Sequence, residues 1–107
     1  MKILLDECVP VQLRDAFSNH DVHSATSSAW RGLSNGALLL RAESERFDLI
    51  IIADKNMRYQ QALSNRKVAI LELWTNHRPT LERQSEYIRA AAEGIDPCSY
   101  LVLIAPY

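Results

Sequence analysis

Five short segments with strand character, separated by longer segments with helical spacing, constrain the fold of this chain more than any other feature. The clearest is residues 49–53, which are apolar at every position, as is typical of a strand buried on both faces of a parallel sheet. The other four are residues 2–5, 22–24, 68–73 and 100–104. Since strands and helices alternate, we predict an α/β fold, a three-layer α/β/α sandwich with a mainly parallel central sheet.

Four helices are expected between these strands. The first begins near Pro10, whose missing N–H is tolerated in a first helical turn. Ser34 or Asn35 is expected to cap the second helix and Thr80 a long last helix, because short polar side chains accept hydrogen bonds from free N–H groups at helix starts. A short third helix is expected over residues 57–63.

Length, charge and cysteine content narrow the class of protein. A chain of 107 residues with 48% hydrophobic content is expected to form one domain over residues 1–107 with a core of its own. The net charge of −1 does not indicate a polyanion binder by bulk charge. Two distant cysteines without a C-x-x-C pair argue against a zinc site or a disulfide framework. Without an evident signal peptide or membrane span, we expect a cytoplasmic protein.

Acidic residues follow two of the expected strands. Asp6 and Glu7 come directly after the first strand, and Asp54 follows the third. Ligand sites in open α/β sheets lie beyond the carboxyl ends of the strands, so these carboxylates converge if the two strands are neighbours. Carboxylate oxygens are the ligands that Mg²⁺ and Mn²⁺ prefer, and Asn35 has an amide oxygen that such an ion also accepts. The alternative interpretation is structural: Asp6 and Asp54 cap the helices that follow them.

Basic and aromatic residues near Asp54 suggest a phosphate-bearing substrate. Between residues 55 and 71 there are four basic side chains and no acidic one, a composition suited to a phosphodiester backbone. The candidate nucleic-acid-binding residues are Lys55, Arg58, Tyr59, Arg66 and Lys67. Tyr59 and Trp30 are candidates for stacking on bases, although aromatic residues in a small domain are more often core. A solvated basic loop is the plain alternative. Cys8 is not expected to be a nucleophile, because neighbouring carboxylates disfavour its thiolate.

Four blocks of the sequence carry a resemblance to a known family. They are ILLDECVP (residues 3–10), GLSNGALLLRAE (32–43), FDLIIIADKNMRYQQAL (47–63) and RKVAILEL (66–73). In content, order and spacing they resemble the PIN-like family of small bacterial proteins, relatives of the PIN-domain nucleases and VapC-type toxins. The resemblance implies a Rossmann-like α/β/α sandwich in which an acidic cluster holds Mg²⁺ or Mn²⁺ and cuts RNA.

The resemblance also implies which residues form that cluster. Asp6 and Asp54 match the family's first and later acids, and are the implied catalytic residues. The family's second acid falls at Asn35 or on the helix after it, where Glu43 is available, and a further acid falls at Asn56. Two expected carboxylates are therefore amides in this sequence, and lower ligand charge weakens binding of a divalent ion. The pattern of Asn35–Gly36 with Asp54–Lys55–Asn56 is that of one branch of the family.

Three functions remain open from the sequence. The first is a divalent-metal-dependent ribonuclease, including the toxin of a toxin–antitoxin pair, with an antitoxin-like protein as partner. The second is a catalytically weakened PIN-like module that binds RNA or a partner protein. The third is a small-ligand protein with another reaction, because a fold alone does not fix a function. A homodimer is expected by analogy with PIN-domain relatives. Leu73, Trp74 and the apolar final strand are candidates for its contact face, and equally candidates for the core.

Overall fold

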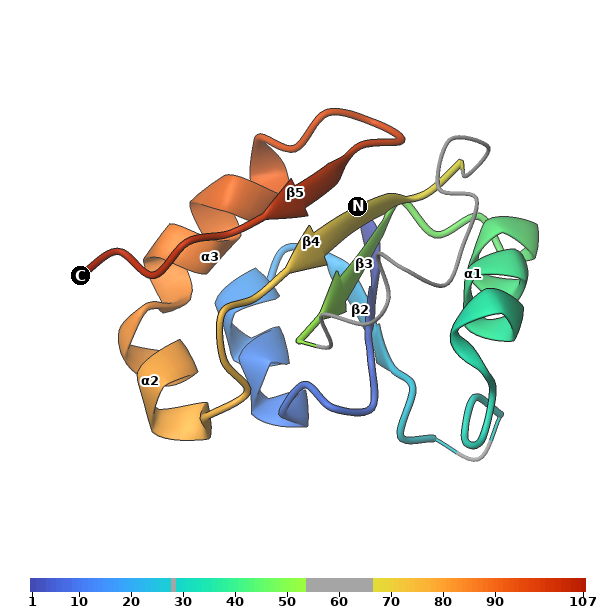
Figure 1. Cartoon of the computed structure of the whole chain (residues 1–107), viewed down its shortest axis with the longest axis horizontal. Helices are drawn as coiled ribbons and strands as arrows, with labels where there is room; N and C mark the ends of the chain where they lie inside the picture. The colour runs from blue at the N-terminus through green and yellow to red at the C-terminus, as the bar shows by residue number, and fades with distance from the viewer. Residues whose placement is uncertain (28, 54–66) are drawn as a thin grey trace.

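A five-stranded sheet forms the centre of the chain in the computed structural model (Figure 1), which describes residues 1–27, 29–53 and 67–107 but not the side chain of Asn35. The strands lie in the order β2-β1-β3-β4-β5, and all four neighbouring pairs are parallel. Their bounds are β1 Lys2–Leu5, β2 Asp21–Ser24, β3 Leu49–Ile52, β4 Ala69–Glu72 and β5 Tyr100–Val102. The α/β class and the five strands are therefore confirmed. The expected helix over residues 57–63 lies outside the described residues.

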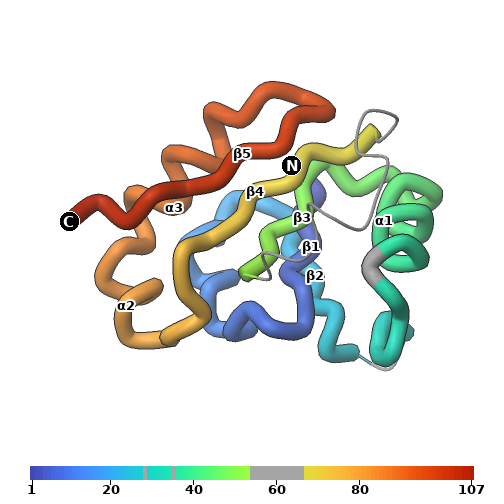
Figure 2. The backbone as a smooth tube through the Cα atoms, in the orientation of Figure 1, coloured from blue at the N-terminus to red at the C-terminus, as the bar shows by residue number. Residues whose placement is uncertain are grey.

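Helices contribute to the core on both faces of the sheet. On one face, η1 (Val11–Phe17), α2 (Arg78–Arg83) and α3 (Ser85–Glu93) pack against Ile3, Leu5, Ile51 and Leu71; we call this the η1 face. On the other face, α1 (Asn35–Ser44) packs against Leu4, Ile50, Ile52 and Ile70; we call this the α1 face. Figures 1 and 2 show α1 on one side of the sheet and α2 and α3 on the other. Alternate residues of each strand point to opposite faces. A strand that is apolar at every position therefore contributes side chains to the cores on both faces of the sheet.

The start of α1 follows the sequence expectation. The Ser34 side chain caps the helix, and its Oγ accepts a hydrogen bond from the Ala37 N–H at 3.2 Å. Of the two candidates, Ser34 is therefore the cap, and Asn35 is the first residue of the helix.

The other two described helical segments differ from expectation. The segment after Pro10 is a 3₁₀ helix rather than an α-helix. The expected long helix from Thr80 is two helices that meet at Gln84, and the N-terminal cap of the first is His77, so Thr80 lies inside α2. No residue in this stretch is a helix breaker, and nothing in the structure explains the break. Leu81, Ile88 and Ala92 of these two helices are buried on the η1 face.

Membrane insertion was also considered for the described helices. Within residues 1–27, 29–53 and 67–107, no helix combines the length and the apolar character that crossing a bilayer requires.

Candidate functional site at the carboxyl end of the sheet

The strand order switches sides between β1 and β3, although all strands run parallel. From β1 the chain proceeds to β2 on one side, whereas β3, β4 and β5 follow one another on the other side. Such a point is the usual ligand crevice of an open parallel sheet, at the carboxyl ends of the strands. The register pairs Leu5 of β1 with Ile51 of β3. The two strands that precede the candidate acids are thus direct neighbours, as the convergence of Asp6 and Asp54 requires.

Asp6 is held at this crevice by its backbone and its side chain. Its N–H donates to the Ile51 carbonyl at 3.0 Å, which extends the β1–β3 ladder by one residue and puts Asp6 beside Ile52. The side chain is 8% exposed, and Oδ2 accepts a hydrogen bond from the Cys8 Sγ at 3.0 Å. Glu7, in the turn after it, is exposed. In this contact the Cys8 thiol is the hydrogen-bond donor.

Asp6 is not the cap of the first helix. Pro10 occupies the N-terminal cap position of η1, and no side chain caps that helix. The Asp6 carbonyl instead accepts from the Val9 N–H at 2.9 Å, closing the turn that leads from β1 to η1. This finding excludes the capping role for Asp6, although its backbone and side chain both take part in the turn.

Glu72 is a buried carboxyl group that the sequence interpretation overlooked. It is the last residue of β4, is 1% exposed and lies opposite Ile52 in the β3–β4 register. Since Glu72 and Ile70 are two residues apart, both point to the α1 face, where Ile70 packs. The Tyr100 hydroxyl donates to Glu72 Oε1 at 2.7 Å. The sequence signal that could have identified Glu72 is that it is the single acid inside the apolar run of residues 68–73.

Asp6, Ile52 and Glu72 therefore form one row across three strands. Leu4 and Ile52 both pack on the α1 face, and Asp6 shares that face because it lies two residues beyond Leu4. Neighbouring strands are about 4.8 Å apart, so the backbones of Asp6 and Glu72 are separated by about 10 Å. Two carboxyl groups thus flank the end of β3, two residues before Asp54 in the sequence.

Two predicted site residues lie at the opposite end of the sheet. Glu43 is near the C-terminal end of α1, and its Oε1 accepts a hydrogen bond from the Lys67 N–H at 2.8 Å. Lys67 is exposed and precedes β4 by two residues. Both residues lie at the amino ends of the strands, where Lys2 Nζ also donates to the Glu45 carbonyl at 2.7 Å. The structure does not bring Glu43 to Asp6 as a metal ligand, nor Lys67 to the crevice as a phosphate ligand.

The remaining predicted residues are only partly described. Asn35 begins α1, but its side chain is not described. The others lie outside the described residues: Asp54, Lys55, Asn56, Arg58, Tyr59 and Arg66. Trp30 is 6% exposed, packs edge-to-face on Phe47 at 5.5 Å between ring centroids and is covered by the Arg41 guanidinium at 4.6 Å. Its side chain belongs to the core and is not available for base stacking.

The described acidic groups do not form a complete metal site by themselves. Among residues 1–27, 29–53 and 67–107, no group of three or more His, Cys, Asp or Glu side chains is arranged to hold a metal ion. Asp6 has the hard oxygen ligands that suit Mg²⁺ or Mn²⁺. Among the residues that follow β3 in the sequence, Asp54 is the first with a carboxylate side chain.

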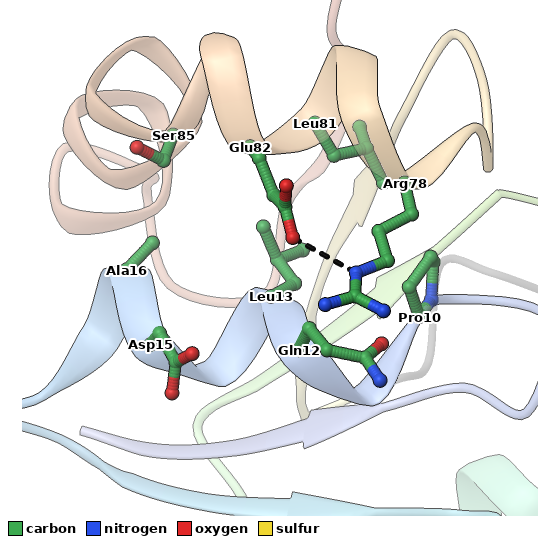
Figure 3. Close-up of a pocket in the computed structure, with 9 residues that line it drawn as sticks. All are labelled: Pro10, Gln12, Leu13, Asp15, Ala16, Arg78, Leu81, Glu82 and Ser85. Carbon is green, nitrogen blue, oxygen red and sulfur yellow. Dashed lines mark hydrogen bonds and ion pairs between the residues drawn. The ribbon is translucent and has the colours of Figure 1, made fainter.

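A cavity of about 240 Å³ lies between η1 and α2 (Figure 3). Arg78 bridges part of it, with its Nε donating to Glu82 Oε1 at 2.8 Å. Both helices begin just after the carboxyl ends of β1 and β4, so the ends marked by Pro10 and Arg78 are the ends nearest the crevice. The lining mixes apolar and polar side chains: Pro10, Gln12, Leu13, Asp15, Ala16, Arg78, Leu81, Glu82 and Ser85.

Comparison of the chain with family models, curated proteins and solved structures gives no match. The functional interpretation therefore depends on the crevice itself.

Proposed function

We propose that this chain is a PIN-like, three-layer α/β/α domain that acts as a divalent-metal-dependent ribonuclease in the bacterial cytoplasm. The observation that carries the proposal is the adjacency of β1 and β3 at the point where the strand order reverses. It puts the buried Asp6 carboxylate beside the strand that Asp54 follows in the sequence. The resemblance in residues 3–73 supports the same activity.

The proposed roles follow from the chemistry of each side chain. Asp6 and Asp54 hold Mg²⁺ or Mn²⁺, with oxygen atoms of Glu7 and Asn35 as further ligands. The bound ion supplies an activated water for attack on a phosphodiester. Three basic residues and one aromatic residue then bind the RNA strand: Lys55, Arg58, Arg66 and Tyr59. Because Asn35 and Asn56 replace two carboxylates of the family pattern, metal affinity is expected to be lower than in a fully acidic site.

Calorimetric titration with Mn²⁺ tests the proposed site. We expect micromolar binding by the wild type, lost in Asp6→Asn and in Asp54→Asn, because each substitution removes one formal charge from the ion's ligands. Asp96→Asn is the matched control, since Asp96 is exposed in the loop before β5, at the amino end of the sheet. RNA cleavage should follow the same order among the variants.

Either of two outcomes contradicts the ribonuclease proposal. One is a wild type that binds Mn²⁺ only at millimolar concentrations. The other is an Asp6→Asn or Asp54→Asn variant that cleaves RNA as fast as the wild type while its circular dichroism spectrum is unchanged.

A second candidate is a module that binds RNA or an antitoxin-like protein without cutting. The amides Asn35 and Asn56, which stand where the family pattern has carboxylates, favour it. Fluorescence anisotropy with labelled single-stranded RNA in EDTA tests it at several salt concentrations. Affinity that persists without metal and falls as salt rises supports binding through phosphate contacts. No RNA affinity in EDTA, combined with cleavage in Mn²⁺, would exclude it.

A further inference from the structure

The cavity between η1 and α2 takes no part in the proposed metal chemistry, and its size limits what it can bind. Its volume is about 240 Å³, which is below the range of roughly 300–1,000 Å³ that is usual for pockets of drug-sized ligands. Leu13 and Leu81, which are both buried, form its apolar part. A cavity of this size and lining suits one small ring system better than a whole nucleotide or a peptide.

The charged side chains around the cavity favour a neutral ligand over a phosphate group. Asp15 and Glu82 are negatively charged, whereas Arg78 is the one positively charged residue of the lining. Because acids outnumber bases, the lining as a whole repels an anion. An RNA phosphate is therefore disfavoured inside the cavity, but an uncharged base is not.

Hydrogen-bond donors and acceptors lie side by side at the cavity. Arg78 Nε donates to Glu82 Oε1 at 2.8 Å, and Figure 3 shows the guanidinium directed toward Gln12 of η1. A guanidinium has several N–H donors and a carboxylate has several acceptor sites, so one contact between them leaves both with further hydrogen-bonding capacity. The Gln12 amide both donates and accepts. The cavity can therefore recognise a ligand edge that carries acceptors next to donors.

Guanine is the base whose edge matches this arrangement. Its O6 and N7 accept hydrogen bonds from a single arginine, which is the commonest base-specific contact that proteins make with nucleic acids. Its N1–H and 2-amino group lie beside O6 and donate, so one carboxylate accepts from both. Adenine carries an amino donor in place of O6, and that donor would face the donors of the guanidinium.

The cavity is close to the proposed catalytic crevice. Pro10, at one end of the lining, lies four residues after Asp6 in the sequence, and Arg78 begins the helix that follows β4. Proteins recognise single-stranded RNA mainly through unstacked bases that are held by hydrogen bonds on their edges. An RNA strand that crosses the carboxyl end of the sheet therefore has a base within reach of the cavity.

We propose that this cavity binds a guanine base of single-stranded RNA, with Arg78 donating to O6 and N7 and Glu82 accepting from N1–H and the 2-amino group. Leu13 and Leu81 contact the ring. The inference deepens the proposed ribonuclease function, on which the position of this base next to the cleaved phosphodiester rests. Binding of the base itself needs neither a metal ion nor Asp6, so it is measured separately from cleavage.

Fluorescence anisotropy of the full chain in EDTA tests the cavity with labelled uridine-rich hexanucleotides. One strand carries a single central guanosine, and two others carry adenosine or inosine at that position. We expect the guanosine strand to bind on the order of ten-fold more tightly than the adenosine strand, the discrimination typical of one bidentate contact. The inosine strand should have an intermediate affinity, because inosine keeps O6 and N7 but lacks the 2-amino group.

Two substitutions each remove one half of the recognition. Glu82→Gln replaces an acceptor with an amide, and Arg78→Lys replaces the planar fork with a single ammonium group. Each should bring the affinities for the guanosine and adenosine strands within about two-fold of each other. Glu86→Gln and Arg83→Lys are the matched controls, because both residues are exposed on the same pair of helices and lie outside the lining. Both controls should keep the wild-type preference, and circular dichroism should show all four variants folded.

Three results would overturn the inference, whether or not the chain cleaves RNA in Mn²⁺. The first is equal affinity of the wild type for the guanosine and adenosine strands, and the second is no measurable affinity for any strand. The third is a guanosine preference that survives in both folded cavity variants. A wild type that prefers guanosine in EDTA but neither binds Mn²⁺ nor cleaves RNA would support the guanine site and contradict the ribonuclease proposal alone.

Discussion

Two carboxyl groups, Asp6 and Glu72, flank Ile52 on the α1 face, yet they differ in setting. Asp6 comes after its strand, in a turn, and retains 8% exposure. Glu72 lies within its strand, is 1% exposed and accepts a hydrogen bond from the Tyr100 hydroxyl. A buried carboxyl group is costly unless its oxygens are hydrogen-bonded. We therefore regard Asp6 as the group available to a ligand and Glu72 as a group tied into the sheet.

Tyr100→Phe tests this view of Glu72. The substitution removes the hydroxyl that donates to Oε1 and keeps the ring. We expect the free energy of unfolding to fall by about 1–3 kcal/mol, the usual cost of leaving a buried polar group without one of its bonds. Urea denaturation followed by circular dichroism measures the change. Tyr107→Phe is the control, because the Tyr107 hydroxyl accepts from Trp74 at an exposed site, and its loss should cost much less.

An equal decrease in the free energy of unfolding of the two variants would show that the hydrogen bond to Glu72 stabilises the protein no more than the exposed bond to Tyr107 does. A higher free energy of unfolding in Tyr100→Phe would show that the hydroxyl does not stabilise Glu72 and that its other contacts are sufficient.

Helix α1 depends on a single side-chain cap. Ser34→Ala removes the oxygen that accepts from the Ala37 N–H, and we expect it to lower the free energy of unfolding by about 1 kcal/mol. Ser44→Ala, at the last residue of the same helix, is the control. It removes a hydroxyl but no N-terminal cap, and alanine is the better helix former, so stability should stay constant or rise slightly. Thermal denaturation of both variants provides the comparison, and equal losses would contradict the cap assignment.

The strands were predictable because a short run of apolar residues at consecutive positions is buried only where both faces of a strand are covered. Residues 49–53 cannot lie on a half-exposed face, and β3 is accordingly the middle strand, buried at every position. The 3₁₀ character of η1 and the break at Gln84 were not predictable, because neither segment contains a residue type that specifies them.

The candidate site was predictable only in part. Asp6 was identified correctly as a residue at the carboxyl end of the sheet, since any residue directly after a strand lies there. The same rule, applied in reverse, puts Glu43 and Lys67 at the amino end, because both lie shortly before a strand begins. Glu72 was overlooked because one polar residue at the end of an apolar run does not reveal which face it points to. That information comes from the register with Ile52.

The order of the strands predicts a gradient of stability across the molecule. β3 and its neighbours β1 and β4 each have a strand on both sides, whereas β2 and β5 have one. In hydrogen exchange, we expect amides of β3 to exchange only through global unfolding and those of the two edge strands, β2 and β5, to exchange fastest. Nuclear magnetic resonance resolves these amides singly. Exchange rates that are uniform across all five strands would contradict the gradient.

The last strand of the sheet is also the last to be made. β1, β2 and β3 precede β4 in the sequence, and N-terminal segments leave the ribosome first. β4 has no outer neighbour until residues 100–103 leave the ribosome, and until then its open side includes Ile70 and the carbonyl of Glu72. Loss of residues 100–103 would therefore expose the outer edge of β4, a strand that is buried at every position, whereas loss of a surface loop exposes no such edge.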